Sequence, residues 1–390
     1  MVRRFLFQVH MWIGLVLGVL FVALGLSGSV LVYHDELDRM TSPLPRATAQ
    51  GAPQSFDTLI ANAEAALPNA RGNIMLSMPE EAGDPAMVRV LAPPRTGDAP
   101  RREGGAGKRP PQPGGAVYLD PVSGAVLGQR TSAMSPLVQF AHDLHGGLMM
   151  GRDGRPLVGW LGVGMVILGI TGLVLWWPKP HLWKYAFTIR RTARGLRFHR
   201  ELHSAVGIWG FIVFIIISFT GVAIAFPETI RAGIAGGAAP AFNLRTGPDV
   251  DPIDGAKRIG ASEAAQVALA AKPGSDVASI MVPSRPSQAI SVALAPHGHE
   301  ATILSMVYVD PYRANVMAIR DPATLSGADS FMAWQRPLHQ GDGLGPIWRF
   351  LTFLSGFLPL LFVVTGVVMW VKKRRARISM NAPLPEGAVS

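Results

Sequence analysis

Long apolar runs without charged residues are the clearest pattern along the chain, and polar segments separate them. Such runs extend over Met11 to Tyr33, Pro156 to Trp177, Leu202 to Pro227 and Phe350 to Val371. Each run is long enough for a helix that crosses about 30 Å of hydrocarbon, which takes roughly 20 residues. We therefore predict an integral membrane protein with four transmembrane helices, over residues 11–33, 156–177, 202–227 and 350–371.

Shorter patterns occupy the two long connections between these helices. In each connection a helical pattern, Phe56 to Leu67 or Ser262 to Ala271, precedes runs with the two-residue alternation of β-strands. A Tyr-x-Asp-Pro sequence, which starts at Tyr118 and again at Tyr308, then introduces residues typical of a hairpin turn. We expect two small external α+β domains, over residues 36–133 and 228–325.

The chain also resembles itself at a shift of 190 to 194 residues. His10 and Ser27-Gly28 recur as His203 and Thr220-Gly221. His145 and Thr171-Gly172 recur as His339 and Thr365-Gly366, and the Tyr-x-Asp-Pro sequences match between them. We interpret this pattern as a tandem duplication, whose halves should pack about a pseudo-two-fold axis along the membrane normal.

Composition supports the membrane assignment, because 49% of the residues are hydrophobic and only 16% are charged. The formal net charge of +10 would suit a nucleic-acid binder, but the basic residues gather beside the apolar runs. They lie before the first run, in the loop 178–201 and in the tail 372–390. This arrangement predicts that these segments and both termini are cytoplasmic and that the two domains are periplasmic. It leaves no basis for a nucleic-acid partner.

Two segments have other interpretations. The first apolar run could be a cleaved signal peptide, but it is too long and no cleavage-site pattern follows it. The segment from Pro93 to Gly115 is rich in Pro, Gly and Arg and predicts a disordered insertion in the first external domain.

The chain contains no cysteine and ten histidines. The missing thiols exclude disulfides, iron–sulfur clusters and covalent haem attachment, so imidazole is the main remaining ligand for a redox centre. A haem iron needs a ligand on each face, and a duplication places each histidine opposite its repeat-mate. We therefore predict that His10 with His203, and His145 with His339, hold two non-covalent b-type haems.

Each of these histidines could instead be a polar interfacial residue, and the repeated pairing favours the ligand interpretation. The external pair belongs to segments 134–155 and 326–349. Other candidate ligands are His34, His142 and His199, because each lies near one of the predicted ligands or a helix end. A metal-ion site with Asp143 or Asp342 is a further alternative.

Four Ser/Thr-Gly pairs, one near the exit of each span, allow two interpretations. Small residues let helices approach each other closely. They could also leave room for a flat macrocycle. Met149 and Met150 are possible axial ligands but fit packing roles better.

These residues together, with Leu144-His145 followed by Thr171 to Pro178 and the paired Tyr-x-Asp-Pro hairpins, resemble the PepSY-associated transmembrane family over nearly the whole chain. This resemblance implies an iron-regulated bacterial inner-membrane protein. The likeness is greatest to the ferric-siderophore reductases, which implies two b-type haems and iron reduction on the periplasmic side. By position, His10 and His203 match the family's inner histidines, and His145 and His339 match the outer ones.

We thus expect a ferric-chelate reductase that transfers electrons across the membrane to a periplasmic ferric siderophore. No G-x-G-x-x-G motif follows a strand, so the electron donor should be quinol or a separate flavoprotein. Two alternatives are a haem-free regulatory or sensor protein and a metal or proton transporter. Transport is disfavoured because the centre of each span lacks a charged residue.

Overall fold

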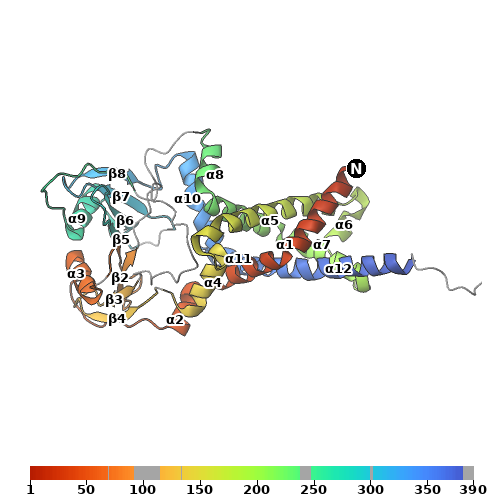
Figure 1. Cartoon of the computed structure of the whole chain (residues 1–390), viewed down its shortest axis with the longest axis horizontal. Coiled ribbons are helices and arrows are strands. Elements are labelled where there is room, and N and C mark those ends of the chain that lie inside the picture. The colour runs from red at the N-terminus through yellow and green to blue at the C-terminus, as the bar shows by residue number, and fades with distance from the viewer. Residues whose placement is uncertain (69, 92–114, 133, 238–246, 299–301, 381–390) are drawn as a thin grey trace, which may run out of the picture. The chain divides into compact units, whose positions relative to one another are not determined.

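The computed structural model describes all residues except 69, 92–114, 133, 238–246, 299–301 and 381–390. The insertion predicted at Pro93 to Gly115 lies outside the described residues, apart from Gly115. The chain forms two compact units. The helical unit comprises residues 1–35, 136–233 and 331–390, and the sheet unit comprises residues 36–135 and 234–330 (Figure 1).

Four helical segments of the helical unit are long and apolar enough to cross a membrane. They are α1 (Val2–Val32), α5 (Arg155–Trp176), α7 (Gly195–Ala225) and the consecutive helices α11 (Gly345–Ser355) and α12 (Leu358–Met380). Helix α1 packs on α5, α5 on α7, α7 on α12 and α12 on α1, so the four form a closed ring. In this ring the equivalent helices of the two halves, α1 and α7, lie diagonally opposite each other.

The helices extend beyond the predicted spans. Helix α1 begins nine residues before Met11, and α7 begins seven residues before Leu202. The last span is interrupted at Gly356 and Phe357. The apolar pattern marks the part of a helix that suits hydrocarbon, whereas charged residues such as Arg3 and Arg200 continue the helix beyond it.

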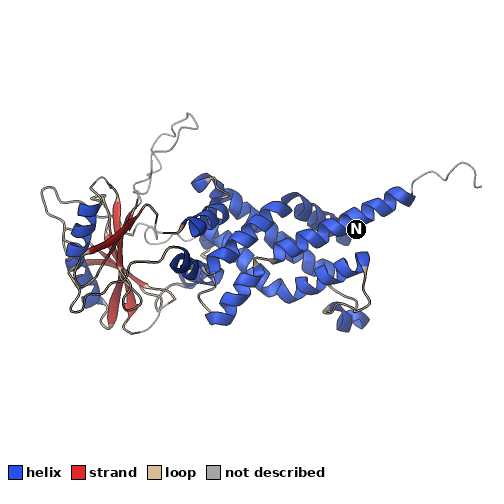
Figure 2. Cartoon of the chain, turned by 90° about the horizontal axis from the view of Figure 1, so that it is seen from below, coloured by secondary structure: helices blue, strands red, loops and turns tan. Residues whose placement is uncertain are grey.

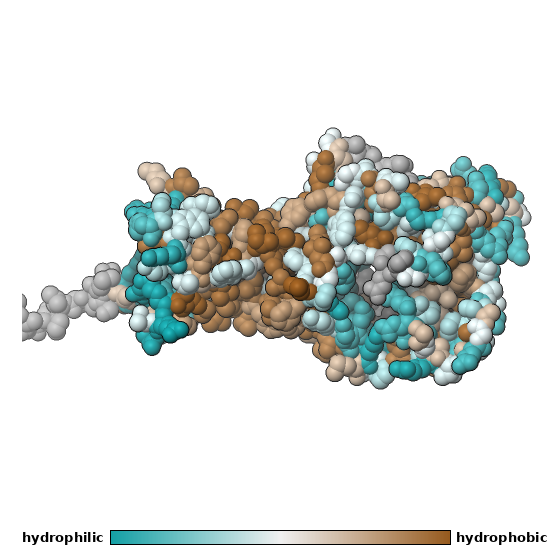
Figure 3. All heavy atoms as spheres, turned by 180° about the vertical axis from the view of Figure 1, so that it is seen from behind, coloured by the Kyte–Doolittle hydropathy of each residue, from teal (hydrophilic) through white to brown (hydrophobic). Residues whose placement is uncertain are grey.

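Apolar side chains cover the outer surface of this ring. Large exposed hydrophobic residues occur in all four spans, including Val16, Val19, Ile170, Ile212 and Val364. Figure 3 shows this apolar surface along the helices in brown. A mostly apolar surface of this kind suits contact with lipid rather than water.

Shorter helices lie in the helical unit or at the residues where the chain passes from one unit to the other. They are α2 (His34–Thr41), α4 (Pro136–Gly147), α6 (Trp183–Ala186), α8 (Pro227–Ile234), α10 (Gly327–Gln340) and the 3-10 helices η1 (Gly151–Gly154) and η2 (Pro180–Leu182). Helix α4 packs on α1 and on α5.

The sheet unit contains one eight-stranded antiparallel sheet in the order β4-β3-β2-β1-β5-β6-β7-β8. Its strands are β1 (Asn73–Ser77), β2 (Ala86–Leu91), β3 (Ala116–Leu119), β4 (Val126–Arg130), β5 (Ser275–Val282), β6 (Ile290–Pro296), β7 (Ser305–Val309) and β8 (Val316–Arg320). We expected two separate small domains. The pairing of β1 with β5, with Leu76 opposite Ile280, instead joins both halves in one sheet.

One face of the sheet carries the hydrophobic core. Helices α3 (Phe56–Ala66) and α9 (Ala261–Ala271) pack on this face, as Figure 2 shows for the helices beside the red strands. Leu59, Leu76 and Ile280 are fully buried in this core. The Asp57 carboxylate of α3 accepts a hydrogen bond from the Ala261 backbone N–H at 2.6 Å, which caps the first turn of α9.

The Tyr-x-Asp-Pro sequences form the predicted hairpin turns. The Asp120 carboxylate accepts hydrogen bonds from the backbone N–H groups of Val122 and Ser123 in the turn, and from those of Thr48 and Ala49 in the segment before α3. Asp310 accepts the equivalent bonds in the second hairpin. These aspartates therefore have a structural role in the turns.

Candidate cofactor site

Two pairs of histidines face each other within the helical unit, at different levels of the bundle. His10 of α1 and His203 of α7 have ring centroids 6.2 Å apart, with an interplanar angle of 71°. His145 of α4 and His339 of α10 have ring centroids 5.9 Å apart, with an interplanar angle of 43°. The structure thus brings together the same four histidines that the repeat paired, and each pair contains one histidine from each half of the chain.

The Nδ1 atom of every paired histidine has a hydrogen-bond partner on a neighbouring helix. His10 Nδ1 lies 2.9 Å from Thr171 Oγ1 of α5, and His203 Nδ1 lies 2.7 Å from Thr365 Oγ1 of α12. Each half of the chain therefore positions its own histidine, and the two halves meet at the pair.

The second pair repeats this arrangement with backbone oxygens. His145 Nδ1 lies 2.9 Å from the Leu24 carbonyl oxygen of α1, and His339 Nδ1 lies 3.0 Å from the Ile217 carbonyl oxygen of α7. Thr220 Oγ1 is a second partner of His339 Nδ1, at 3.0 Å. A carbonyl oxygen only accepts, so Nδ1 of both rings carries the proton.

His10 and His203 also carry their proton on Nδ1. The hydroxyl groups of Thr171 and Thr365 donate to the Ile167 and Leu361 carbonyl oxygens one turn earlier, at 2.7 Å in each case. Each Oγ1 atom then accepts from the histidine Nδ1–H. The Nε2 lone pair of each ring stays available for a ligand, and such a fixed orientation is typical of metal-binding histidines.

Three glycines of the Ser/Thr-Gly pairs leave room for the imidazole rings. A Cβ atom at Gly28 would lie 2.9 Å from His145 Cε1, and one at Gly221 would lie 3.1 Å from His339 Cε1. At Gly172 the nearest atom is His10 Cε1, at 3.3 Å. In three of the four Ser/Thr-Gly pairs the glycine therefore makes space for a histidine ring, a role that neither sequence interpretation included; Gly366 has no such contact among the described residues. Their constant offset from each histidine was the signal that could have indicated it.

The spacing of both pairs fits one metal ion between the two rings. The ring centroids, 6.2 and 5.9 Å apart, are close enough for the two histidines of each pair to hold one metal ion together. The donor set, two neutral imidazoles in an apolar helix bundle, suits a haem iron.

Burial favours the neutral form of the rings in the pair outside the spanning segments. It lowers the pKa of His145, and it lowers the pKa of His339 to about 3. Neutral imidazole is the form that binds a metal ion.

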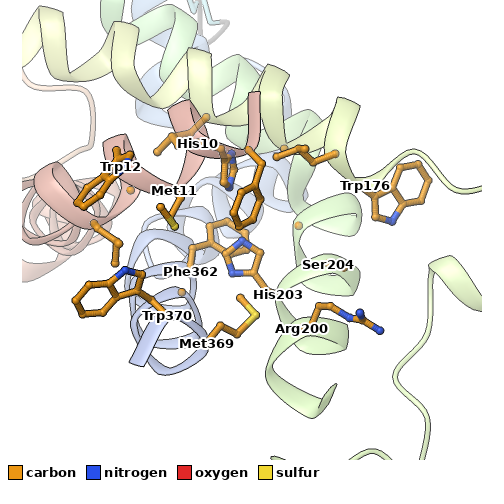
Figure 4. A pocket seen from close by; sticks show the side chains of 18 of the residues that line it. His10, Met11, Trp12, Trp176, Arg200, His203, Ser204, Phe362, Met369 and Trp370 are labelled. Carbon is orange, nitrogen blue, oxygen red and sulfur yellow. The ribbon is translucent and has the colours of Figure 1, made fainter. Parts of the chain in front are cut away.

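A cavity of about 1590 Å³ opens beside the His10–His203 pair. Figure 4 shows the two histidines at its centre, with Trp12, Trp176 and Trp370 around them. This volume exceeds the roughly 300–1,000 Å³ of pockets for drug-sized ligands. Apolar and aromatic side chains line most of the cavity. No Asp or Glu occurs among the described residues that line it. Seven lining residues are basic: Arg3, Arg4, Arg197, Arg200, Lys373, Arg374 and Arg377.

The remaining candidate histidines lie outside both pairs. His34 Nδ1 bonds to the Leu31 carbonyl oxygen at 2.9 Å, and the exposed His142 lies 3.5 Å from the Asp143 carboxylate. His199 Nδ1 is buried and has no hydrogen-bond partner within the described part of the chain. Met149 and Met150 are exposed. In the described ranges, no three His, Asp or Glu side chains gather in a way that would suit the alternative metal-ion site.

Sequence reasoning did not single out Phe362 of α12. Its ring centroid lies 4.9 Å from that of His203, at an interplanar angle of 50°. An apolar residue within an apolar span gives no sequence signal of such a contact. Phe362 restricts the space beside His203 and helps to fix the ring position.

The ring of four helices that are long and apolar enough to cross a membrane defines a membrane protein, and two pairs of facing histidines lie in its helical unit. The chain belongs to the PepSY-associated TM region family, which it matches over residues 7–373. It is also similar to an uncharacterized Pseudomonas aeruginosa protein, PA4219, with 34% identity over 87 residues. That match covers 22% of this chain and 21% of the length of the relative.

Proposed function

We propose that this protein is a dihaem ferric-chelate reductase of the bacterial inner membrane, which reduces a periplasmic ferric siderophore and so releases ferrous iron. The observation that carries this proposal is the pair of matched imidazole sites, with centroid separations of 6.2 and 5.9 Å. In each site the Nδ1 atoms have partners and the Nε2 lone pairs are available.

Haem bound at each pair would supply a one-electron redox centre. The chain's own residues hold and orient the ligands. Thr171 and Thr365 fix the inner pair through Nδ1, and the Leu24 and Ile217 carbonyl oxygens fix the outer pair. A hydrogen bond of this kind also increases the basicity of the ligating nitrogen.

The orientation of the protein follows from its basic residues. Those at the start of α1, in the loop before α7 and at the end of α12 indicate a cytoplasmic end with both termini inside. The His10–His203 pair lies near that end. His145 contacts α1 at Leu24 and Gly28, 14 to 18 residues beyond His10, which corresponds to about 21–27 Å along the helix. The His145–His339 pair therefore lies near the periplasmic side.

The duplication accounts for two sites in one chain. In the sheet unit the element order α3-β1-β2-β3-β4 recurs as α9-β5-β6-β7-β8. We propose that this unit is periplasmic and provides the docking surface for the ferric chelate. Hard oxygen ligands hold ferric iron tightly, and the gain of one electron weakens that hold.

The electron donor is external to the chain, because no dinucleotide-binding motif occurs in the sequence. Quinol and a separate flavoprotein are the donor classes that we consider. The membrane lipid is a further partner of the apolar helix surfaces.

The proposal is tested with haem-loaded protein that has been reduced without oxygen and then mixed with a ferric hydroxamate chelate. We expect the reduced haem bands to decay while a ferrous-specific chromophore forms. The gallium(III) complex of the same chelator has the same charge but takes up no electron, so it should leave the bands unchanged. Equal decay with gallium, or no ferrous iron with the ferric chelate, would contradict the proposed activity.

A further inference from the structure

The cavity beside the His10–His203 pair carries more positive charge than the proposed haem requires. Seven basic residues from α1, α7 and α12 line it, and none of its described lining residues is acidic. The two propionate groups of a haem would neutralise two of these charges. Like charges around one partly apolar cavity repel each other, and an anionic ligand relieves that repulsion.

Three of these arginines form no side-chain hydrogen bond or ion pair within the described part of the chain, whereas others do. Arg3 donates to the Leu175 carbonyl oxygen at 2.7 Å, and Arg197 forms an ion pair with Glu201 at 2.9 Å. The side chains of Arg4, Arg200 and Arg377 form no hydrogen bond or ion pair with described residues. They come from the three different helices of the cavity, so their charges converge on one space.

The rule that places basic residues on the cytoplasmic side explains the sign of these charges. It does not explain why they line a single cavity. The loop residues Lys179 and Arg191, which obey the same rule, do not line it. The cavity therefore has the composition of an anion-binding site with apolar and aromatic walls.

The proposed function limits the chemical class of anion that the cavity would bind. The donor must deliver single electrons beside the inner histidine pair, and it must come from outside the chain. Quinol is uncharged and gains nothing from seven cations. Nicotinamide cofactors transfer hydride, whereas flavins also carry out one-electron chemistry. Guanidinium groups bind phosphate with charge-assisted, bidentate hydrogen bonds.

We propose that this cavity binds dihydroflavin mononucleotide as the electron donor, with its phosphate on Arg4, Arg200 and Arg377 and its ring system among the cavity's aromatic side chains. This inference rests on the proposed electron-transfer function. Trp12, Trp176 and Trp370 surround the histidine pair (Figure 4) and provide flat apolar surfaces for a planar ring.

The stoichiometry balances with the proposed reaction. One dihydroflavin loses two electrons and two protons and becomes oxidised flavin. The two electrons reduce two ferric chelates to the ferrous state, one at a time. The two protons are released on the cytoplasmic side.

The test compares the binding of flavin mononucleotide with that of riboflavin, which has the same ring system but no phosphate. The full chain is placed in nanodiscs of uncharged phosphatidylcholine, and binding is followed by the quenching of flavin fluorescence. We expect the mononucleotide to bind at least about tenfold more tightly than riboflavin. Equal affinities would overturn the inference.

A matched pair of triple variants tests the site. Arg4→Gln with Arg200→Gln and Arg377→Gln should remove the preference for the mononucleotide. The control combines Lys179→Gln, Arg191→Gln and Arg375→Gln, which removes the same charge from residues that do not line the cavity. An equal loss in both variants would assign the effect to general surface charge and contradict the site.

Nanodiscs that contain phosphatidylglycerol distinguish a lipid headgroup from the free nucleotide. If this lipid abolishes mononucleotide binding, the arginines bind a headgroup and the flavin inference is wrong. The visible spectrum reports on haem separately. A colourless protein that retains arginine-dependent mononucleotide binding would contradict the haem proposal and leave the flavin site supported.

Discussion

Hydrogen bonds at Nδ1 determine what the four paired histidines offer to a ligand. A buried neutral imidazole has one donor and one acceptor nitrogen. Here a carbonyl oxygen, or a hydroxyl that has already donated its own proton, accepts from Nδ1 in every case. The acceptor Nε2 is therefore the free atom in all four rings.

His203 and His339 differ in the number of hydrogen-bond acceptors around Nδ1, and this difference can be tested. Thr365→Val removes the hydroxyl that accepts from His203 Nδ1 and leaves a buried N–H unpaired, at a cost of about 1–3 kcal/mol. We expect haem affinity at this pair to fall by about 10- to 100-fold. The rate of haem transfer to apomyoglobin measures the effect.

Thr220→Val is the matched control for this substitution. His339 Nδ1 retains the Ile217 carbonyl oxygen at 3.0 Å after the threonine hydroxyl is lost. Haem transfer should then accelerate far less than in the Thr365 variant. A larger effect of Thr220→Val would show that the tautomer argument is wrong.

The glycines of the Ser/Thr-Gly pairs provide a second contrast, between Gly28 and Gly366. Gly28→Ala places a methyl group 2.9 Å from His145 Cε1, so the ring must shift. Gly366 has no atom of the described residues within 4 Å of the equivalent Cβ position. We expect Gly28→Ala to reduce the haem content toward one per chain and Gly366→Ala to keep it at two. Equal content in both variants would mean that the glycine has no steric role.

At the scale of the secondary-structure elements, the sequence predicted the existence of the four long helices better than the residues at which they begin and end. Apolar length identified all four spans, but α1 and α7 begin before the uncharged runs, in segments that contain charged residues such as Arg3 and Arg197. The strands and hairpins followed from alternation and from the Asp-Pro turns. The pairing of β1 with β5 could not be predicted, because Leu76 and Ile280 are far apart in sequence and alternation does not specify a partner.

The hairpin aspartates lead to a prediction for the sheet unit. Backbone hydrogen bonds, with that from Ala49 first, lower the pKa of Asp120 to about 2, below its ordinary value of 3.8. The lowered pKa means that the carboxylate stabilises the fold above about pH 4, and that this contribution is lost as the pH falls toward 2.

Asp120→Asn should therefore weaken the β3–β4 hairpin at neutral pH and make it less sensitive to acid than in the unmodified protein. Hydrogen exchange of the β3–β4 peptide at pH 7 and pH 3, corrected for intrinsic rates, measures this. An acid response as large in the variant as in the unmodified chain would contradict the assigned role of Asp120.

At the scale of the whole molecule, the internal repeat of the sequence predicts the two histidine pairs that the structure brings together. His10 and His203 are almost half the chain apart, and only the repeat linked them. The Thr171 and Thr365 hydroxyls were visible as repeated residues, but their role depends on how α5 and α12 pack against the neighbouring helices. Helix packing of this kind is not encoded in any local pattern.

The proposed orientation predicts which segments are accessible from the periplasm. Since the chain has no cysteine, a single introduced cysteine is a unique label. A membrane-impermeant maleimide added to intact spheroplasts should modify Ser123→Cys in the sheet unit and leave Thr192→Cys in the basic loop unmodified. The reverse pattern would invert the topology.

The haem content of the purified chain tests the central claim most directly. The protein in detergent should show a Soret band and sharp dithionite-reduced bands, with about two haems per chain by pyridine haemochrome analysis. His203→Ala and His339→Ala should each reduce this ratio toward one. A folded but colourless protein, or an unchanged ratio in both variants, would contradict the assignment of these histidines as haem ligands.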